Sequence, residues 1–398
     1  MGPLDGVRVV ELSHEHVAFA GKLLADLGAE VTVVEPPGGS PQRGYPPFLD
    51  DDPGPERSLW WWHYHTGKRS VVLDPAAAGD ADRLDVLVAS ADIVLVGEDA
   101  GVAWENLHAA HPRVLMVSIT PFGLGSPRAG EAVTDLTILA EAGPAWSCGY
   151  DDHTTPPVRG AGNQASHTAG NWAVLAVLAA LIHRDHGGPG QLIEVSMLEA
   201  SNVTTELATY GWLQAGIEVQ RQTGRHAAPV LTPPTQVRCR DGRYATTGVP
   251  PRDPATFGAL VGLLDRRGLR ERFEGTAVLE LGAELSEPIN LGALEHDPLA
   301  ADIITTARDA IWFLAEQLDA HDFFLETQRI GIATGAVLTP GEATMDPHFV
   351  ERGFPVEIEH EDLGRTITYP GPPYQFREAP LQVRRPPRLG EHHDIFGS

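Results

Sequence analysis

The sequence predicts an α/β protein whose larger lobe is built on a parallel sheet and is accompanied by a smaller α+β lobe. Two observations lead to this prediction. Short runs of β-branched and other apolar residues alternate with stretches of helical periodicity in the first half of the chain, which is typical of strand–helix–strand units. The length of 398 residues also exceeds what one ordinary core occupies, so two lobes are expected.

The expected elements follow one another as strand, helix and strand. Buried strands are predicted from apolar runs at residues 7–12, 30–35, 70–73, 92–96, 113–119 and 191–195. Helices are predicted between them at residues 21–27, 79–89, 104–110 and 168–184, and from 196 onward. The long apolar helix at 168–184 ends at a pair of glycines, which favour the termination of a helix.

Composition divides the chain further. Residues 219–237 are rich in Pro, Thr and basic residues, which is typical of a connecting segment. We therefore expect a large lobe from residues 1–203 and 340–398, a linker at 204–237 and a small lobe at 238–339.

The charge balance excludes some partners. Lys and Arg total 29 against 54 Asp and Glu, which gives a formal net charge of -25. Such a surface repels nucleic acids and anionic membranes, so neither is expected as a partner. It repels any other polyanion too, unless a local basic pocket overrides the average.

The cellular location is expected to be the cytoplasm. Cys148 and Cys239 are the only cysteines, too few for a disulfide framework or a cysteine-rich zinc site. The amino-terminal residues contain no apolar signal segment. The most apolar helical segment, 173–182, is shorter than the ~20 residues that cross a bilayer.

Two nucleotide-binding classes are disfavoured by missing glycine motifs. The turn after the first strand reads SHEHV at residues 13–17, with no glycine before Gly21, whereas a dinucleotide fold places a glycine-rich turn there. A phosphate-binding G-x-x-x-x-G-K-[ST] loop is absent as well. Dehydrogenase and P-loop ATPase chemistry are therefore not expected.

Histidine pairs and an aromatic run are the remaining local motifs. His14 with His16, and His63 with His65, would each place two imidazoles on one side of a strand. Since no third ligand accompanies them, no metal site is predicted. The run WWWHYH at residues 60–65 could wall an acyl pocket, but core or dimer interface is the favoured interpretation.

Several stretches resemble the family III CoA-transferases. They are GKLLADLGAEVTVVEPPGGSP, HTGKRSVVLD, HPRVLMVSITPFGLGSP, AALIHRDHGGPGQLIEVSMLEA, RCRDGRY, MDPHFVERGF and APLQVRRPPRLGEHHDIF. They occur in the family's order and cover most of the chain, except for a weak stretch at residues 241–318. The resemblance implies a Rossmann-like large lobe and two chains threaded into an interlocked dimer.

The resemblance also implies an activity, the transfer of CoA from an acyl-CoA to a carboxylic acid, with CoA as a substrate and not as a resident cofactor. An aspartate attacks the thioester to make a mixed anhydride and releases the CoA thiolate, which later returns to form the new thioester. In the family this aspartate lies four residues before a glycine at the start of the long helix. The matching segment QASHTAG places Ser166 there, four residues before Gly170.

Three interpretations of Ser166 and its neighbours are open. Ser166 could be a nucleophile activated by His167, or it could simply cap the helix, which is the favoured interpretation. Asp135, in a segment similar to the family's Tyr-Asp-Leu, could supply a carboxylate, although a helix-starting acid is the more ordinary role. A racemase would need a histidine before Asp135, and position 134 is threonine.

The region that resembles the family's CoA pocket is unusually acidic. Glu98, Asp99 and Glu105 stand where relatives place neutral or basic residues, and each like charge near a phosphate costs about a kcal/mol or more. The basic residues that could meet CoA are Lys68, Arg69 and Arg43.

Three functions follow as hypotheses. The leading one is a family III CoA-transferase subunit that lacks the aspartate and assembles with an aspartate-bearing paralogue, because GKLLADLGA and NQASHTAG are similar to the aspartate-lacking branch of heteromeric benzylsuccinate CoA-transferase. The second is a homodimeric acyl-CoA enzyme, such as a hydrolase, that uses Ser166 and His167. The third is a non-catalytic scaffold or regulatory subunit. The sequence does not name the acid.

Overall fold

The structure is a computed structural model that describes residues 2–74, 77–98, 100–205 and 207–396. It divides into two compact units. The larger comprises Met1–Gly149, Pro156–Val219 and Thr344–Ser398, and the smaller comprises Tyr150–Thr155 and Gln220–Ala343.

A six-stranded parallel sheet forms the centre of the larger unit. Its strand order is β3-β2-β1-β4-β5-β6, and every neighbouring pair is parallel. The strands are β1 (Arg8–Leu12), β2 (Glu30–Glu35), β3 (Arg69–Val72), β4 (Ile93–Val96), β5 (Leu115–Thr120) and β6 (Leu192–Ser196). Each agrees with a predicted strand to within two residues, so the predicted parallel sheet is confirmed.

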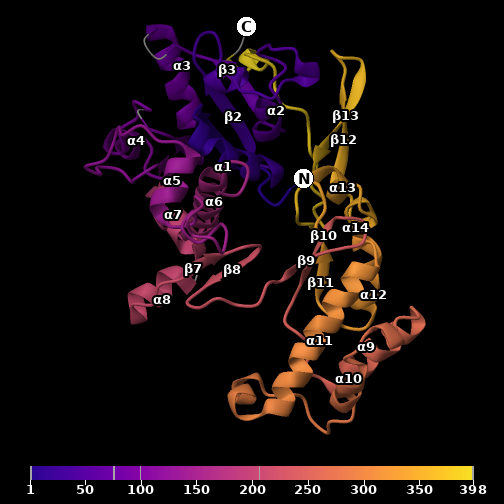
Figure 1. The fold of residues 1–398 in the computed structure, drawn as a ribbon. Helices are drawn as coiled ribbons and strands as arrows, with labels where there is room; N and C mark the ends of the chain where they lie inside the picture. Colours follow the sequence, from indigo (N-terminus) through magenta and orange to yellow (C-terminus); the bar gives the residue numbers. More distant parts are fainter. Residues whose placement is uncertain (1, 75–76, 99, 206, 397–398) are drawn as a thin grey trace. The chain divides into compact units, whose positions relative to one another are not determined.

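Helices cover both faces of this sheet (Figure 1). The α-helices along residues 1–219 are α1 (Glu15–Asp26), α2 (Leu59–Tyr64), α3 (Ala78–Ala89), α4 (Trp104–Ala110), α5 (Asp135–Ala142), α6 (Gln164–Asp185), α7 (Met197–Asn202) and α8 (Leu207–Ala215). Successive side chains of a strand point to opposite faces, and the cores follow this rule. Val9 packs with α1 and α6 on one face, whereas Val10 packs with α3 and α4 on the other.

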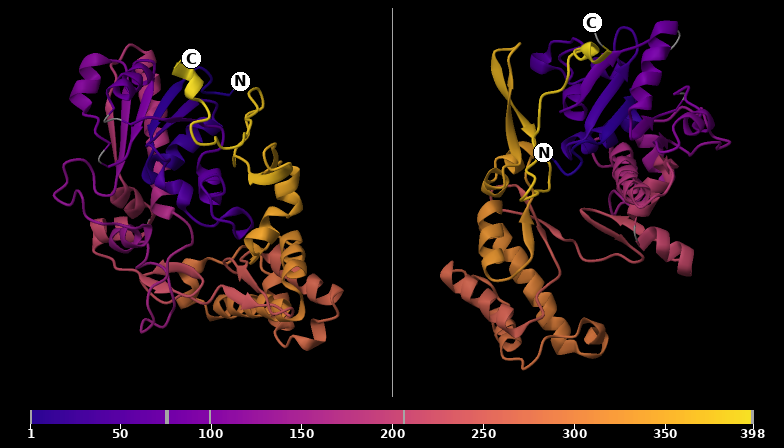
Figure 2. Two further views of the ribbon diagram at one scale, coloured as in Figure 1. Left: turned by 90° about the horizontal axis from the view of Figure 1, so that it is seen from above. Right: turned by 180° about the vertical axis from the view of Figure 1, so that it is seen from behind.

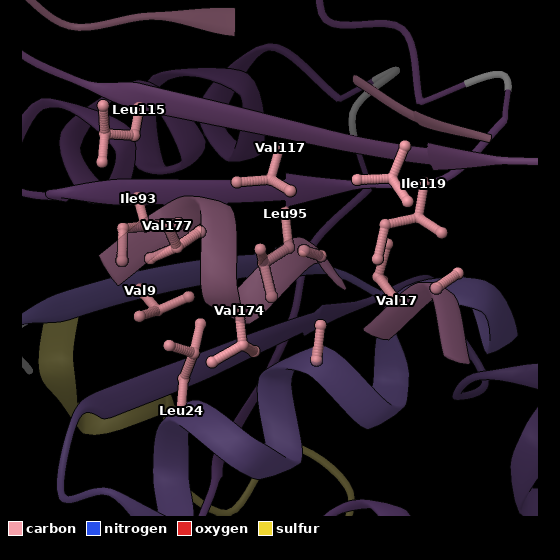
Figure 3. Packing of buried hydrophobic residues seen from close by; sticks show 14 of the residues in the cluster. Val9, Val17, Leu24, Ile93, Leu95, Leu115, Val117, Ile119, Val174 and Val177 are labelled. Carbon is pink, nitrogen blue, oxygen red and sulfur yellow. The ribbon is translucent and has the colours of Figure 1, made fainter. Parts of the chain in front are cut away.

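An apolar core lies between the sheet and the helices α1 and α6 (Figure 3). Side chains from three strands meet those of the two helices there, namely Val9, Ile93, Leu95, Leu115, Val117 and Ile119 with Val17, Leu24, Val174 and Val177. Because both faces of the sheet are buried, the strands read as continuous β-branched and aliphatic runs. This is the pattern from which the sheet was predicted.

Two local predictions near the amino terminus are wrong. Helix α1 begins at Glu15, six residues before its predicted start, because the His14 side chain caps it by accepting a hydrogen bond from the backbone N–H of His16. His63 and His65 lie in and after helix α2, which Ser58 caps, so they are not on one side of a strand. The aromatic run suggested no helix because its residues form no helical stripe.

Helix α6 is longer than the apolar segment that suggested it. Its 22 residues are long and apolar enough to cross a membrane, with a mean hydropathy of 1.4 over the most apolar stretch, and half of that stretch is buried inside the protein. It packs against α1 and lies along β5 and β6, which is the position of a core helix. A Cβ on Gly170 would lie 2.9 Å from Phe19 Cδ1 and 3.2 Å from the Ala20 nitrogen, so glycine permits the close approach of the two helices.

The carboxyl-terminal segment returns to the edge of the sheet. Ser70 of β3 accepts a hydrogen bond through its hydroxyl from the Gly390 N–H and through its carbonyl from the His392 N–H. Figures 1 and 2 show this segment beside the first strands. The hairpin β12 (Pro355–His360) and β13 (Arg365–Pro370) and the short helix α14 (Pro347–Glu351) precede it.

The smaller unit is α+β, as predicted. A three-stranded antiparallel sheet in the order β11-β10-β9 packs with four helices around a second core. Its elements are β9 (Gln236–Arg238), β10 (Tyr244–Thr247), β11 (Thr334–Ala336), α9 (Pro254–Arg266), α10 (Thr276–Ala283), α11 (Pro298–Gln317) and α12 (Ala320–Arg329). Helix α13 (Pro340–Thr344) follows. The residues expected as a linker contain α8 and the hairpin of β7 (Gln220–Gln222) and β8 (Arg225–Ala228).

Candidate functional site

The sheet order reverses between β1 and β4, and ligands of open α/β sheets bind in the crevice beyond the carboxyl ends of such strands. The loop after β1 carries His14, and the loop after β4 carries Gly97. A Cβ at position 97 would lie 2.3 Å from His14 Cγ. Glycine is therefore required for the imidazole to rest on the neighbouring loop.

A pocket of about 400 Å³ opens beside this crevice, between the loops that follow β4 and β5. Its walls are mostly glycine, alanine and valine, and no Lys or Arg is among the described residues that line it. Ser118 and Glu98 are two of its polar lining residues. The Ser118 hydroxyl is buried and has no hydrogen-bond partner.

The predicted acidic residues divide around this pocket. Glu98 lies in its wall, and Glu105 is exposed in the first turn of α4, outside the lining. Asp99 lies outside the described residues. The electrostatic argument against a CoA phosphate in this pocket therefore rests on Glu98 and on the lack of a lining cation.

Lys68 does not line this pocket. Its ammonium group donates to both oxygens of Glu11, at 2.9 and 2.7 Å, and to the Ala18 carbonyl at 2.9 Å. Both side chains are fully buried. Burial raises the pKa of Glu11 to about 7 although Lys68 acts in the opposite direction. Lys68 thus neutralises a buried carboxylate beneath α1.

The two arginines are also engaged in ion pairs. Arg43 is buried, holds both oxygens of Glu35 at 2.7 and 2.8 Å, and lies 3.8 Å from the centroid of the Trp61 ring. Arg69 forms a half-exposed pair with Glu30 at 2.7 Å. CoA binding by Lys68, Arg69 and Arg43 remains a prediction, and the contacts of Lys68 and Arg43 give these two a structural role.

Asp135 caps helix α6 from outside. It lies in the first turn of α5, as the sequence predicted, and its Oδ1 accepts a hydrogen bond from the Ala165 N–H at 2.8 Å. Its Oδ2 pairs with Arg159 at 2.9 Å. A carboxylate at a helix amino terminus satisfies a free N–H and complements the helix dipole.

Ser166 is therefore not a capping residue, and that interpretation is wrong. Helix α6 begins at Gln164 with Asn163 at the N-cap position, which puts Ser166 at the third helical residue. Ser166 is partly buried, and its hydroxyl has no hydrogen-bond partner among the described residues. The residue that the resemblance places at the family's aspartate position is thus a neutral hydroxyl, with no hydrogen-bonded base among the described residues.

His167 faces away from Ser166 into an aromatic cluster. Its Nε2 lies 2.7 Å from the Tyr64 hydroxyl, and its ring stacks on Phe19 with centroids 4.1 Å apart. Asn163 donates to the same tyrosine hydroxyl at 3.1 Å. Burial lowers the pKa of His167, although the charge of Asp135 acts in the opposite direction. Adjacent helical residues do not face each other, so Ser166 and His167 form no dyad.

Tyr64, Asn163 and Phe19 are the residues that sequence reasoning missed. Tyr64 belongs to the aromatic run, most of which lies in the core, where Trp61 is fully buried and stacks on His65 with centroids 3.6 Å apart. No sequence pattern links position 64 to position 167, because the two meet only through the packing of α2 against α1 and α6. The described residues contain no group of three or more metal-ligating side chains.

Comparison with known proteins agrees with this fold. The model of CoA-transferase family III matches residues 4–393. The chain is similar to the BbsE subunit of succinyl-CoA:(R)-benzylsuccinate CoA-transferase from Thauera aromatica, with 28% identity over 97% of this chain and 91% of that protein. It is similar to the same degree, 28%, to succinate–glutarate CoA-transferase of Agrobacterium fabrum, over 98% and 94% of the two chains.

Solved structures give the same result. A CaiB/BaiF family protein from Brucella suis aligns with a TM-score of 0.77 at 26% identity, covering 99% of this chain and 98% of the other. The match thus covers the whole fold, from the parallel sheet to the small unit. The chain belongs to CoA-transferase family III and is an enzyme chain of the CoA-transferase type.

Proposed function

We propose that this chain is a CoA-transferase subunit that contributes no nucleophile and acts on an acyl-CoA and a carboxylic acid together with an aspartate-bearing paralogue. The observation that carries the proposal is the first turn of α6. Ser166 stands in the nucleophile's place, has no base, and its neighbour His167 is held by Tyr64. A serine ester is too stable to exchange CoA between two acids, whereas an acyl anhydride does so readily.

The pocket beside the sheet supports the same division of labour. A polyanionic CoA needs cations where its phosphates lie, and no described lining residue is Lys or Arg. The paralogue would supply the complete CoA site, and this chain would supply the scaffold and part of the acyl site. CoA enters only as substrate in this proposal, and the complex would work in the cytoplasm.

Relatives support the assembly and the class of substrate. One of them is named as a subunit of a CoA-transferase. Succinyl-CoA occurs in the names of several others, including succinyl-CoA–D-citramalate CoA-transferase of Chloroflexus aurantiacus. Succinyl-CoA is therefore the donor to test first, with a panel of carboxylic acids as acceptors.

The test is acyl transfer by the purified chain alone and after co-expression with a homologue encoded beside it. We expect transfer by the pair and none by the chain alone, and Ser166→Ala in the pair should keep its activity. Loss of transfer when the partner's aspartate is replaced by asparagine would locate the nucleophile there.

Three results would overturn the proposal. Transfer by the lone chain, abolished by Ser166→Ala, would make Ser166 the nucleophile. Hydrolysis of succinyl-CoA by the lone chain would favour the serine–histidine enzyme. A complex whose rate equals that of the partner alone would leave this chain a scaffold.

A further inference from the structure

A second pocket lies at the amino ends of the strands, on the opposite edge of the sheet from the crevice. It has a volume of about 420 Å³, and the first residues of three neighbouring strands line it. Parts of the amino-terminal turn, the end of α1 and the segment 380–384 complete its wall. We call this space the amino-end pocket. Its charged lining residues are Asp5, Arg8, Asp26, Glu30, Arg69 and Arg384.

Glycines form the wall of this pocket on its amino-terminal side. Gly2 packs against the turn between α1 and β2, where a Cβ at position 2 would collide with the Leu27 carbonyl oxygen. Gly28 in that turn has a φ of 99°, and a Cβ there would lie 2.8 Å from the Gly2 Cα. Both glycines line the pocket. Two backbone segments therefore meet closely at the wall, without side chains that would fill the space.

Two carboxylates of the pocket are neutralised by cations of the protein. Glu30 pairs with Arg69 at 2.7 Å. Asp26 is buried at the end of α1 and pairs with Lys22 at 2.9 Å. These pairs account for two acidic lining residues and one basic lining residue.

Two guanidinium groups at the pocket have no such partner. Among the described residues, the side chains of Arg8 and Arg384 form no ion pair and no hydrogen bond, and both are exposed. The backbone N–H of Arg8 donates to Asp92 at 2.9 Å, but that carboxylate pairs with Arg184. The backbone of Arg384 is held in place, because its carbonyl accepts a hydrogen bond from the Gly67 N–H at 3.1 Å.

The composition of the chain makes these two arginines unusual. Acidic residues number 54 against 29 Lys and Arg, so carboxylate partners for a guanidinium are plentiful. Asp5 is exposed and is the remaining charged lining residue without an ion pair within the described part of the chain. Two free cations outweigh it, and the amino-end pocket is therefore locally positive in a chain of net charge -25.

We propose that the amino-end pocket binds a small anion through an oxyanion group, a carboxylate or a phosphate, to which the guanidinium groups of Arg8 and Arg384 donate hydrogen bonds. A guanidinium presents parallel N–H groups that match the oxygens of either group. The volume of about 420 Å³ leaves room for a body of several atoms behind the oxyanion.

A bound anion would join two parts of the chain that are far apart in sequence. Arg8 belongs to the first strand of the sheet, whereas Arg384 belongs to the carboxyl-terminal segment that returns to the sheet edge. Figures 1 and 2 show the amino terminus beside this segment. The anion would therefore hold the segment to the sheet, and a ligand that binds only the folded state raises its stability. This site is separate from acyl transfer and does not depend on the proposed function.

The test is thermal unfolding and titration calorimetry of the full chain with sodium succinate and, separately, inorganic phosphate. Sodium chloride at equal ionic strength is the reference. We expect a saturable rise in Tm and a saturable heat of binding with at least one of the two probes. Arg8→Gln and Arg384→Gln should each weaken the affinity about tenfold or more, because each removes a charged hydrogen-bond donor.

Two further variants make the test specific. Asp5→Asn should act in the opposite direction and strengthen binding about threefold, because it removes a like charge from the pocket. Arg377→Gln is the matched control, since Arg377 is an exposed arginine of the same carboxyl-terminal segment and does not line the pocket. It should leave the affinity unchanged.

The outcomes separate cleanly. Binding of succinate alone would assign the site to carboxylates, binding of phosphate alone would assign it to phosphates, and both results support the proposal. The absence of any saturable effect beyond that of chloride in the wild-type chain would overturn it, and this result needs no variant to fold. A probe that binds Arg8→Gln and Arg384→Gln as tightly as the wild type occupies another place, which would overturn the proposal as well.

Discussion

Two polar regions of the larger unit differ in how completely their groups are paired. Beneath α1, the ammonium of Lys68 meets a carboxylate and a carbonyl, and Arg43 meets Glu35 through two nitrogens. At the first turn of α6, Ser166 and the Nδ1 atom of His167 have no partner among the described residues. A buried charge that loses its partner destabilises a fold, whereas unpaired groups at a surface can meet a ligand. The contrast separates structural cations from candidate binding groups.

Breaking the paired region should have the largest effect. Lys68→Met leaves Glu11 buried without its cation, and removal of one partner of a buried pair costs about 3–5 kcal/mol. Urea unfolding followed by circular dichroism would measure this loss. Arg69→Ala, which opens the half-exposed pair with Glu30, should cost less than about 1 kcal/mol. Equal losses for the two variants would contradict the comparison.

Acid should destabilise the larger unit through its buried histidines. Burial lowers the pKa of His16 to about 4, while the unfolded side chain titrates near 6.5. The unfolded state therefore binds more protons between pH 6.5 and 4, so stability falls as the pH falls through this window. His16 alone contributes roughly 3 kcal/mol, at 1.36 kcal/mol per pKa unit.

Urea unfolding at several pH values would check this effect. His16→Asn should flatten the dependence, and His186→Asn, at an exposed position, should not. Glu11, whose pKa is raised to about 7, has the opposite slope between pH 4.5 and 7, so the difference between variants is more informative than the wild-type curve. An unchanged slope in His16→Asn would show that His16 is not buried in its neutral form.

Gly170→Ala should disturb the contact between α1 and α6. The added methyl group would lie 2.9 Å from Phe19 Cδ1, and overpacking of this kind costs about 1–3 kcal/mol. Because Phe19 stacks on His167, the same variant should alter the NMR signal of the His167 ring. Gly258→Ala in α9, where the nearest atom would be 3.6 Å away, is the control. A stable Gly170→Ala protein with an unaltered signal would contradict the packing argument.

Ser166→Ala should have the smallest effect on stability. The hydroxyl has no partner to lose, so the free energy of unfolding should change by no more than about 0.5 kcal/mol. Thermal unfolding would measure the change. A loss above 1 kcal/mol would show that the Ser166 hydroxyl forms a contact that stabilises the fold.

The sheet and its order of elements could be predicted because the sequence pattern follows burial. The runs at residues 31–34 and 93–96 consist almost entirely of β-branched and aliphatic residues, since both faces of the sheet are covered. The α6 site could be predicted only in part. Ser166 and Asp135 were found from the resemblance, but the contact of Tyr64 with His167 joins residues 103 positions apart. The pairing of Lys68 with Glu11 could not be predicted either. A lysine next to a predicted strand is ordinarily a solvated cation, and the sequence does not show the carboxylate that it pairs with.

The central claim, that Ser166 is not a nucleophile, is tested most directly by intact-mass spectrometry of the chain after incubation with succinyl-CoA. We predict no succinyl adduct on the chain alone, at any time point. In the complex, a hydroxylamine-sensitive adduct should form only on the partner. A succinyl ester on this chain that disappears in Ser166→Ala would contradict the account.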